Sequence, residues 1–242
     1  EKPMEYINSN ALGTLKVLEA CRNSKIKKLV YAASSSCYGL AKTPTREIDK
    51  IDPQYPYALS KFIGEEICLH WSKIYKFPVN SIRIFNAYGP RVRTTGAYGA
   101  VFGVFFKQKL AGKPFTVVGD GKQKRDFVYV TDVCEAFYKA AITKHTGKIF
   151  NLGGENPQSV NKLVKIIGGK KTFIKRRPGE PFKTHSNNTK IRKLLKWYPK
   201  MTFEKGVNIM MRDIQNWKDA PLWNTSKINK ATKTWFKYLG RK

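Results

Sequence analysis

Short apolar segments alternate with helical segments in the first half of the chain, and this alternation limits the possible folds most. Residues 28–33 (KLVYAA) form an apolar run of strand length, and residues 79–85 (VNSIRIF) form another. Residues 5–24 carry apolar side chains with helical spacing, and a second helix is expected at 56–75. Strands joined through helices pair in parallel by right-handed crossovers, so the sequence predicts an α/β sheet.

The rest of the chain is expected to contain shorter elements. The predicted strands are residues 115–118, 149–152 and 172–175, and the predicted helices are residues 98–111, 131–142, 159–167, 190–197, 203–217 and 225–239. Thr131 is a plausible N-cap for its helix. In the last third these elements are polar and are separated by prolines, so we expect them to form a smaller lobe beside the sheet.

The formal net charge of +29 is extreme for a chain of 242 residues. Such a charge is typical of proteins that bind nucleic acid or anionic membranes. However, Lys and Arg are spread along the whole chain, without a basic tail or the signature of an RNA-binding module. We therefore expect no specific nucleic-acid partner and no membrane partner, although a nucleotide diphosphate would still be attracted.

The cysteines and the N-terminal sequence indicate a protein of the reducing cytoplasm. The four cysteines are scattered, with no C-x-x-C pair and no histidine at ligand spacing: Cys21, Cys37, Cys68 and Cys134. This pattern argues against a metal site and against a disulfide scaffold. The first residues carry no signal-peptide pattern, and no apolar run is long enough to cross a bilayer.

Three residues form the strongest chemical pattern in the sequence. Tyr57 and Lys61 are four residues apart on a predicted helix, so they share one face. A nearby ammonium lowers the pKa of a phenol, which can then act as a base. Ser34 follows a predicted strand, at the edge where ligands bind in open α/β sheets. Ser34 and Tyr57 could therefore meet over one substrate hydroxyl.

The sequence resembles the extended short-chain dehydrogenase/reductase family, and within it the NAD-dependent epimerases that act on UDP-sugars. Seven segments carry this resemblance in the family's order: residues 10–14 (NALGT), 31–39 (YAASSSCYG), 56–61 (PYALSK), 83–91 (RIFNAYGPR), 119–127 (GDGKQKRDF), 151–153 (NLG) and 177–180 (RPGE). The resemblance implies a Rossmann-like, doubly wound parallel sheet with a smaller C-terminal α/β substrate lobe.

The resemblance also implies roles for single residues. Tyr57 would remove the proton from a sugar hydroxyl as hydride leaves the same carbon, and Ser34 would hydrogen-bond the reacting oxygen. Lys61 would hold the nicotinamide ribose and lower the pKa of Tyr57. Tyr57 and Lys61 would thus both contact the NAD cofactor. Asn10 would lie near NAD, and Phe85 would border its nicotinamide.

A UDP-sugar substrate follows from the same resemblance. Asn86 would contact the diphosphate of the substrate, and Arg125 and Arg177 would grip that diphosphate with their guanidinium groups. Thr184 would lie beside C2 of the sugar, where a small side chain can admit an N-acetyl group. These four residues are the expected substrate-binding residues, together with Ser34.

The two positions after Ser34 distinguish between reactions in this family. Dehydratases have an Asp-Glu pair there, and UDP-glucuronate decarboxylases usually have a Glu at the second position. Ser35 and Ser36 occupy these places, and neither ionises in the useful range. The sequence therefore favours 4-epimerisation. Among the substrates that the resemblance implies, UDP-glucose and UDP-galactose are expected first, as in galactose metabolism. The alternatives are a UDP-N-acetylglucosamine or UDP-glucuronate 4-epimerase and, less favoured, a UDP-glucuronate decarboxylase or a non-catalytic nucleotide-sugar-binding fragment.

The Gly-rich turn that binds the cofactor pyrophosphate in this family has no counterpart in the sequence. We expect that roughly 80–90 residues, about one mononucleotide-binding half of the fold, are absent before residue 1, and that the chain alone binds NAD poorly. Residues 1–90 would be the remaining part of the NAD-binding domain. Residues 91–242 would mainly form the substrate lobe, with segments near 115–152 returning to the sheet domain. A homodimer through the Tyr57 helix and the helix before it is expected by resemblance.

Overall fold

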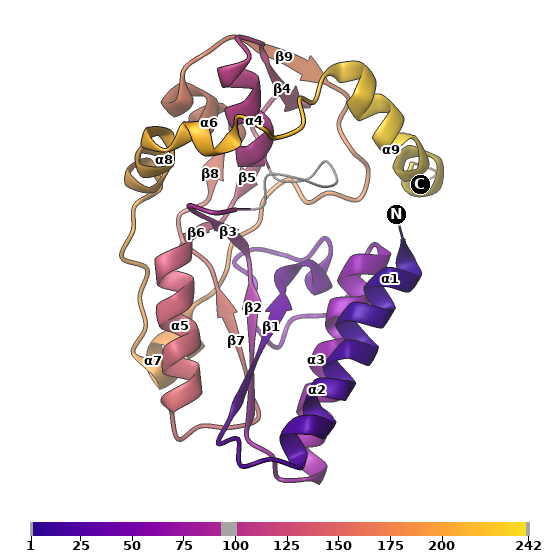
Figure 1. Cartoon of the computed structure of the whole chain (residues 1–242), viewed down its shortest axis with the longest axis vertical. Coiled ribbons are helices and arrows are strands. Elements are labelled where there is room, and N and C mark those ends of the chain that lie inside the picture. Colours follow the sequence, from indigo (N-terminus) through magenta and orange to yellow (C-terminus); the bar gives the residue numbers. More distant parts are fainter. Residues whose placement is uncertain (1, 93–100, 241–242) are drawn as a thin grey trace.

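The computed structural model describes residues 2–92 and 101–240. A three-stranded parallel sheet lies in one half of the molecule, in the order β1-β2-β7 (Figure 1). Its strands are β1 (Leu29–Ser34), β2 (Val79–Ile84) and β7 (Lys148–Leu152). Ser34 pairs with Ile84, and Ile84 pairs with Leu152, so the carboxyl ends of the three strands meet at one edge. The predicted α/β class with parallel strands is confirmed.

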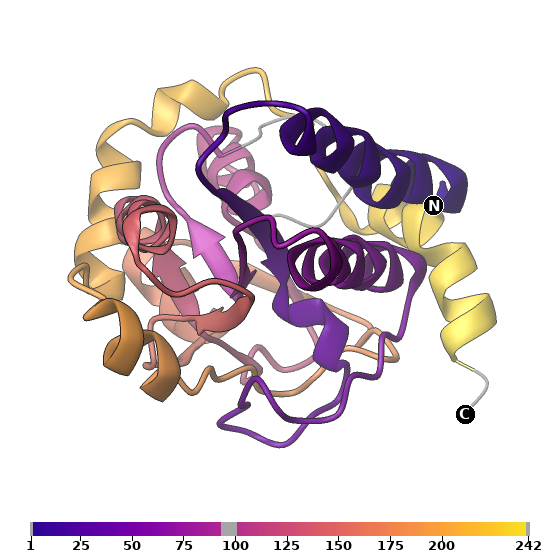
Figure 2. The same cartoon turned by 90° about the horizontal axis from the view of Figure 1, so that it is seen from below.

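Helices cover both faces of this sheet, as Figure 2 shows. On one face Leu18 is fully buried in a cluster with Tyr31. On the other face Ile82 packs in a cluster with Ala136 and Ile191. Because both faces are covered, β2 is buried along almost its whole length, which is typical of parallel sheets. The covering helices are α2 (Gly13–Arg22) and α3 (Pro56–Ile74) on the first face, and α5 (Val130–Ile142) and α7 (Thr189–Leu195) on the second.

The single helix expected at residues 5–24 is divided by a π-helical segment. Helix α1 (Pro3–Ile7) leads into the π-helical residues Asn8–Leu12, and α2 follows directly. A Cβ atom at Gly64 of α3 would lie 2.3 Å from the Asn10 carbonyl oxygen, so the widened turn approaches α3 where that helix has no side chain. Such insertions are frequent at functional sites.

The second half of the molecule is a lobe of short strands and helices (Figure 1). Its strands pair as β3 with β6, β4 with β9, and β5 with β8. The strands are β3 (Asn86–Tyr88), β4 (Phe115–Val118), β5 (Lys124–Arg125), β6 (Phe127–Tyr129), β8 (Gln158–Ser159) and β9 (Lys171–Ile174). The helices are α4 (Val101–Leu110), α6 (Val160–Ile167), α8 (Phe203–Arg212) and α9 (Thr225–Leu239).

Aromatic side chains hold this lobe together. The Tyr88 and Phe102 rings stack with centroids 5.0 Å apart, and the Phe127 and Phe203 rings stack at 4.9 Å. All four belong to one buried cluster. Such ring pairs stabilise a core beyond the area they bury. Because Tyr88 and Phe127 belong to the paired strands β3 and β6, this core also fixes the backbone near Asn86.

One expected helix cap is wrong, one expected helix is shorter, and one lies partly outside the described residues. Thr131 is not an N-cap: α5 begins at Val130 with Tyr129 at the N-cap position, and no side chain caps it. The helix expected at residues 203–217 ends at Arg212 and is followed by a short 3-10 helix, Ile214–Trp217. The helix expected at 98–111 is described from Val101 onward, because residues 98–100 lie outside the described residues.

Candidate active site

The turn after β1 brings together four side-chain hydroxyls. Ser34 ends β1 and caps the 3-10 helix Ser35–Tyr38, and its Oγ lies 2.8 Å from Ser36 Oγ. Ser34 lies close enough to the Tyr57 phenol to oppose the rise of its pKa, and Ser36 has the same effect on Tyr55. The four hydroxyls are therefore gathered around one turn, where Ser34 and Ser36 hydrogen-bond each other. The sequence placed Ser34 and Tyr57 at one sheet edge, and the structure brings them close together.

Tyr57 lies in the first turn of α3, directly after the helix-starting Pro56. Its ring stacks on Tyr55 at 6.5 Å and meets Tyr6 of α1 edge-on at 5.6 Å. Burial raises the pKa of the Tyr57 phenol, and the hydrogen bond with Ser34 opposes this effect. The residue is still 38% exposed, so a ligand can reach it.

Lys61 lies one turn further along α3, on the same face as Tyr57. Its ammonium lies over the Tyr31 ring, 4.5 Å from the centroid. Burial lowers the pKa of Lys61, and the charge of nearby Glu65 partly offsets the effect. In this structure the pKa of Tyr57 is raised rather than lowered, so the expected influence of Lys61 on Tyr57 is not visible here. Its role toward NAD stays a prediction.

The two other residues expected near NAD flank this group. Asn10 donates a hydrogen bond of 3.0 Å to Ser60 Oγ, and Ser60 donates one of 2.9 Å to the Tyr57 carbonyl. The π-helical segment is thus tied to the turn of α3 that carries Tyr57. Phe85 follows β2, its amide donates to the Leu152 carbonyl at 2.9 Å, and its ring contacts Tyr38.

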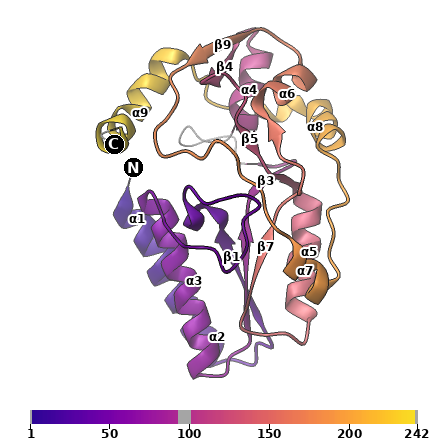
Figure 3. The same ribbon diagram turned by 180° about the vertical axis from the view of Figure 1, so that it is seen from behind.

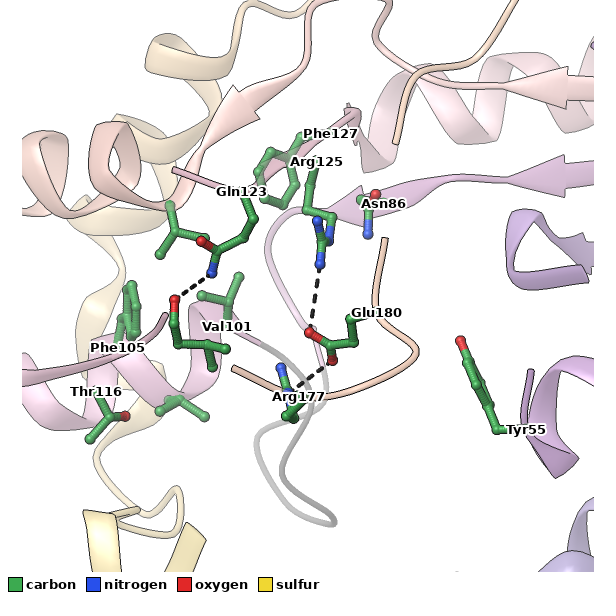
Figure 4. A pocket seen from close by; sticks show the side chains of 13 residues that line it. Tyr55, Asn86, Val101, Phe105, Thr116, Gln123, Arg125, Phe127, Arg177 and Glu180 are labelled. Carbon is green, nitrogen blue, oxygen red and sulfur yellow. Dashed lines mark hydrogen bonds and ion pairs between the residues drawn. The ribbon is translucent and has the colours of Figure 1, made fainter. Parts of the chain in front are cut away.

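A cavity of about 300 Å³ lies between the residues around Tyr57 and the second lobe (Figure 4). Tyr55 forms its wall on the α3 side, and the other walls come from β3 to β6, α4, α6 and the segment after β9. Its lining residues are Tyr55, Asn86, Val101, Val104, Phe105, Thr116, Val118, Gln123, Arg125, Phe127, Val160, Arg177 and Glu180. Three of the expected substrate-binding residues are therefore part of one cavity. Apolar walls with a few convergent polar groups are typical of small-molecule sites.

The two expected diphosphate-binding arginines converge on one carboxylate. Arg177 Nε lies 2.9 Å from Glu180, and an Arg125 guanidinium nitrogen lies 3.7 Å from the same carboxylate (Figure 4). Burial lowers the pKa of Arg125, and the Glu180 charge opposes that shift. Arg125 also donates to the Pro181 carbonyl at 2.9 Å. The two guanidinium groups therefore face one point of the cavity, where Glu180 now supplies the carboxylate that they bind.

Thr184 contacts the expected diphosphate ligand Asn86 rather than the cavity. Its hydroxyl donates to Asn86 Oδ1 at 3.0 Å and accepts from the Asp126 amide at 3.0 Å. Thr184 is not among the residues that line the cavity. In this structure it orients the Asn86 side chain, and its expected place beside the sugar stays a prediction.

The sequence did not assign roles to two residues that line the cavity, Tyr55 and Glu180. Tyr55 precedes Tyr57 by two residues. Residues two apart do not share a face of a helix, so the sequence did not predict that Tyr55 would point toward the site. Glu180 ends the RPGE segment. Its negative charge, in a chain with 46 Lys and Arg but 17 Asp and Glu, was the feature that could have indicated a role in the site. Both side chains become recognisable only when their distant partners are known.

The comparison with protein families decides the family to which this chain belongs. The NAD dependent epimerase/dehydratase family matches residues 1–153, which include Ser34, Tyr57 and Lys61. The chain belongs to this family. The resemblance to nucleotide-sugar epimerases drawn from the seven segments is thereby confirmed.

Relatives of this epimerase/dehydratase family member have known names and structures. The UDP-glucuronate 4-epimerase of Thermodesulfobacterium geofontis is 33% identical over 86% of this chain and 65% of its own length. The crystal structure of UDP-glucuronic acid 4-epimerase from Bacillus cereus, in complex with UDP-glucuronic acid and NAD, has a TM-score of 0.79 and 32% identity over 86% of this chain and 67% of that chain.

A third relative differs in the sugar that its name gives. UDP-N-acetylglucosamine 4-epimerase from Methanobrevibacter ruminantium M1, in complex with UDP-N-acetylmuramic acid, has a TM-score of 0.84 and 26% identity over 89% of this chain and 71% of that chain. These structures confirm the Rossmann-like class of the fold. The chain spans about 65% of the length of the curated relatives it matches.

The described part of this family member contains neither a candidate metal site nor a helix that could span a membrane. Residues 2–92 and 101–240 contain no group of three or more His, Cys, Asp or Glu side chains that could hold a metal ion. None of the helices in the same part of the chain is long and apolar enough to span a bilayer.

Proposed function

We propose that this chain carries the catalytic and substrate-binding residues of an NAD-dependent nucleotide-sugar 4-epimerase. The observation that carries the proposal is the closeness of Ser34 to the Tyr57 phenol, whose ring stacks on Tyr55 in the wall of a cavity with two arginines. The family supplies the reaction class. The cavity supplies a site for the anionic part of a nucleotide sugar.

The residues fit the nicotinamide ribose end of NAD. Tyr57 and Lys61 share one face of α3 at the carboxyl edge of the sheet, where cofactors bind in this fold class. Lys61 has no salt bridge among the interactions described, and its ammonium rests on a ring from which it can turn to ribose hydroxyls. Asn10 supports the same turn through Ser60. When bound, NAD supplies the acceptor and donor of hydride.

Tyr57 moves the proton in this proposal. The Tyr57 phenolate removes the proton from the sugar C4 hydroxyl, and Ser34 hydrogen-bonds the same oxygen. After the keto-sugar has rotated to present its opposite face, Tyr57 returns the proton to that oxygen, so the reaction neither gains nor loses a proton. Arg125, Arg177 and Asn86 hold the diphosphate meanwhile, which keeps the nucleotide fixed while the sugar rotates.

The hydroxyls of the β1 turn favour epimerisation over elimination. Ser36 occupies a position where an acid would be needed for elimination, and its hydroxyl instead hydrogen-bonds Ser34. UDP-glucose and UDP-galactose are the substrates that we propose first. UDP-glucuronate is the second candidate, because two of the relatives above are named for it.

The test of this proposal is an epimerase assay on the protein encoded by the full reading frame. The enzyme is incubated with NAD and separately with UDP-glucose, UDP-glucuronate and UDP-N-acetylglucosamine, and the 4-epimers are separated by chromatography. We expect one pair to interconvert and Tyr57→Phe to lower kcat by about 10²- to 10⁴-fold. No interconversion of any of the three, or full activity of Tyr57→Phe, contradicts the proposal.

We also propose a cytoplasmic homodimer. The exposed apolar side chains of Val17 on α2 and Leu59 on α3, at 52% and 45% exposure, lie on the helices through which relatives are expected to pair. The four cysteines are unpaired, as in a reducing compartment. Sedimentation equilibrium tests the dimer, and a Leu59→Glu variant that sediments like the wild type would contradict this interface.

A further inference from the structure

Helix α9 crosses from the second lobe toward the first helices of the chain. Figure 1 shows α9 leaving the second lobe on the side where α1 begins, and Figure 3 shows the same from behind. Asn224 caps its first turn by accepting from the Lys227 amide at 2.9 Å. Near its start Ile228 is 2% exposed and packs in a cluster with Val118 and Ile174 of the β4–β9 pair. The helix is therefore anchored at its amino end, independently of the residues further along.

Trp235 of α9 contacts two segments that border the cavity. Its ring lies 5.5 Å from the Tyr55 ring, measured between centroids, with the planes inclined by 41°. Its indole Nε1 donates a hydrogen bond of 2.7 Å to the Pro178 carbonyl oxygen. One side chain thus contacts both the segment before α3 and the segment after β9.

These two contacts join opposite walls of the cavity. Tyr55 lines the cavity on the side of the Ser34–Tyr57 pair and stacks on the Tyr57 ring with nearly parallel planes. Pro178 lies between Arg177 and Glu180, which line the cavity on the side of the arginines. A Cβ atom at Gly179 would lie 3.5 Å from Leu239 Cδ1, so the end of α9 also follows this segment.

We propose that α9 is a strap across the nucleotide-sugar site, and that Trp235 is its positioning residue. The proposal rests on the function proposed above. Trp235 fixes the distance between Tyr55 and the segment that carries Arg177. Tyr55 in turn stacks on Tyr57, the residue proposed to transfer the proton. Both ends of the substrate are then held in one geometry before the substrate binds, which lowers the ordering cost of binding.

The anchoring of α9 lets this role be tested without unfolding the helix. Ile228 and Thr232 are the buried residues of α9, and Trp235 is only partly buried. Trp235→Ala removes both contacts, whereas Trp235→Phe keeps a ring against Tyr55 and loses only the donor to Pro178. Tyr238→Ala is a matched control, because Tyr238 is an aromatic residue of the same helix that is 68% exposed.

Two measurements on the 242-residue chain separate the inference from the proposed function. Calorimetry gives the dissociation constants of UDP and UDP-glucuronate, and hydrogen–deuterium exchange without ligand reports on the amides of residues 176–182. We expect Trp235→Ala to raise both dissociation constants by about tenfold, the combined effect of one ring contact and one hydrogen bond. Exchange at 176–182 is expected to become faster, with Trp235→Phe intermediate and Tyr238→Ala like the wild type.

Each other result has a defined meaning. Unchanged exchange in Trp235→Ala overturns the strap, whether or not the wild type binds UDP. Faster exchange with unchanged dissociation constants overturns the positioning role, because the contacts then order residues 176–182 without affecting substrate binding. A wild-type chain that binds neither UDP nor UDP-glucuronate overturns the proposed function and with it the positioning of substrate, while the exchange data still decide whether α9 bridges the two walls.

Discussion

The Tyr57 phenol is subject to two opposite influences in this structure. Burial raises its pKa, and the hydrogen bond with Ser34 lowers it. Only the phenolate can accept the proton of a sugar hydroxyl, so a raised pKa reduces the fraction of Tyr57 that is ready to react at neutral pH. Ser34 therefore has two effects in the proposed reaction, on the substrate oxygen and on the pKa of the base.

Removing the Ser34 hydroxyl should shift the pH dependence of the enzyme. The activity rises with pH as Tyr57 ionises, and Ser34→Ala removes an interaction that lowers the pKa of Tyr57. We therefore expect the acidic limb of the kcat profile to move to higher pH, and kcat at neutral pH to fall by about 10²-fold. The measurement is a kcat profile of the full-length enzyme. Ser35→Ala, in the same turn, is the control, and an unmoved limb in Ser34→Ala would count against this account.

Sequence reasoning reached the residues whose partners lie in regular positions. The Ser34–Tyr57 contact followed from a strand end, a helix start and the parallel sheet that joins them. Tyr55 and Glu180 were not assigned, because their places depend on contacts between segments far apart in the chain. Tyr55 contacts Trp235, and Glu180 contacts Arg125, which no local pattern of the sequence indicates.

A buried ion pair fixes α3, the helix of Tyr57, to the sheet. Glu65 is 1% exposed and accepts hydrogen bonds from Ser81 at 2.6 Å and from Arg83 Nε at 3.0 Å, both on β2. Arg83 also donates to Tyr38 Oη at 2.7 Å, in the turn that begins with Ser34. The same network thus reaches the two elements that carry Ser34 and Tyr57.

Glu65→Gln should strongly destabilise the protein. The substitution leaves the Arg83 charge buried without a counter-charge, and breaking such a pair costs about 3–5 kcal/mol. We expect the free energy of unfolding, measured by urea titration, to fall by about this amount. Glu5→Gln, which breaks the exposed Lys2–Glu5 pair, serves as the control and should leave the transition midpoint unchanged. A Glu65→Gln protein of wild-type stability would contradict the argument.

The π-helical segment depends on Gly64 in the facing helix. A Cβ atom at position 64 would meet the Asn10 carbonyl and the Tyr31 hydroxyl at 2.3 Å each. Gly64→Ala should therefore push α1 and the π-helical residues away from α3, at a cost of about 1–3 kcal/mol in the free energy of unfolding. At Gly13 a Cβ atom would lie 3.3 Å from its nearest neighbour, so Gly13→Ala is the milder control. Equal melting temperatures for both variants would contradict this packing.

The π-helical segment shows why some element boundaries were predicted accurately from the sequence and others were not. The helix at 56–75 and the strands at 28–33 and 79–85 were predicted to within one residue, because each is continuous in sequence pattern. The division of residues 5–24 was not predicted. The π-helical residues pack closely against a glycine on another helix, and periodicity within the segment cannot reveal that contact.

The charge of the whole molecule bears on what it attracts. A formal charge of +29 draws anions to the protein in general, whereas the site that we propose for the substrate diphosphate is confined to two arginines around Glu180 in one cavity. General attraction and specific binding differ in their salt dependence. Contacts with many phosphates release many counterions, and a nucleotide diphosphate releases few.

Salt should therefore separate nucleic-acid binding from nucleotide binding. We expect the affinity for a duplex DNA to fall by about 10³-fold or more between about 50 and 200 mM salt, as for unspecific phosphate contacts. The affinity for UDP should fall by less than about tenfold, because a partly buried site is screened less. Arg125→Met should weaken UDP binding and leave DNA binding unchanged, since it removes one of 46 basic side chains. Fluorescence anisotropy and calorimetry give the two affinities. DNA binding that persists at about 500 mM salt, or that is lost with Arg125, would indicate a specific nucleic-acid site instead.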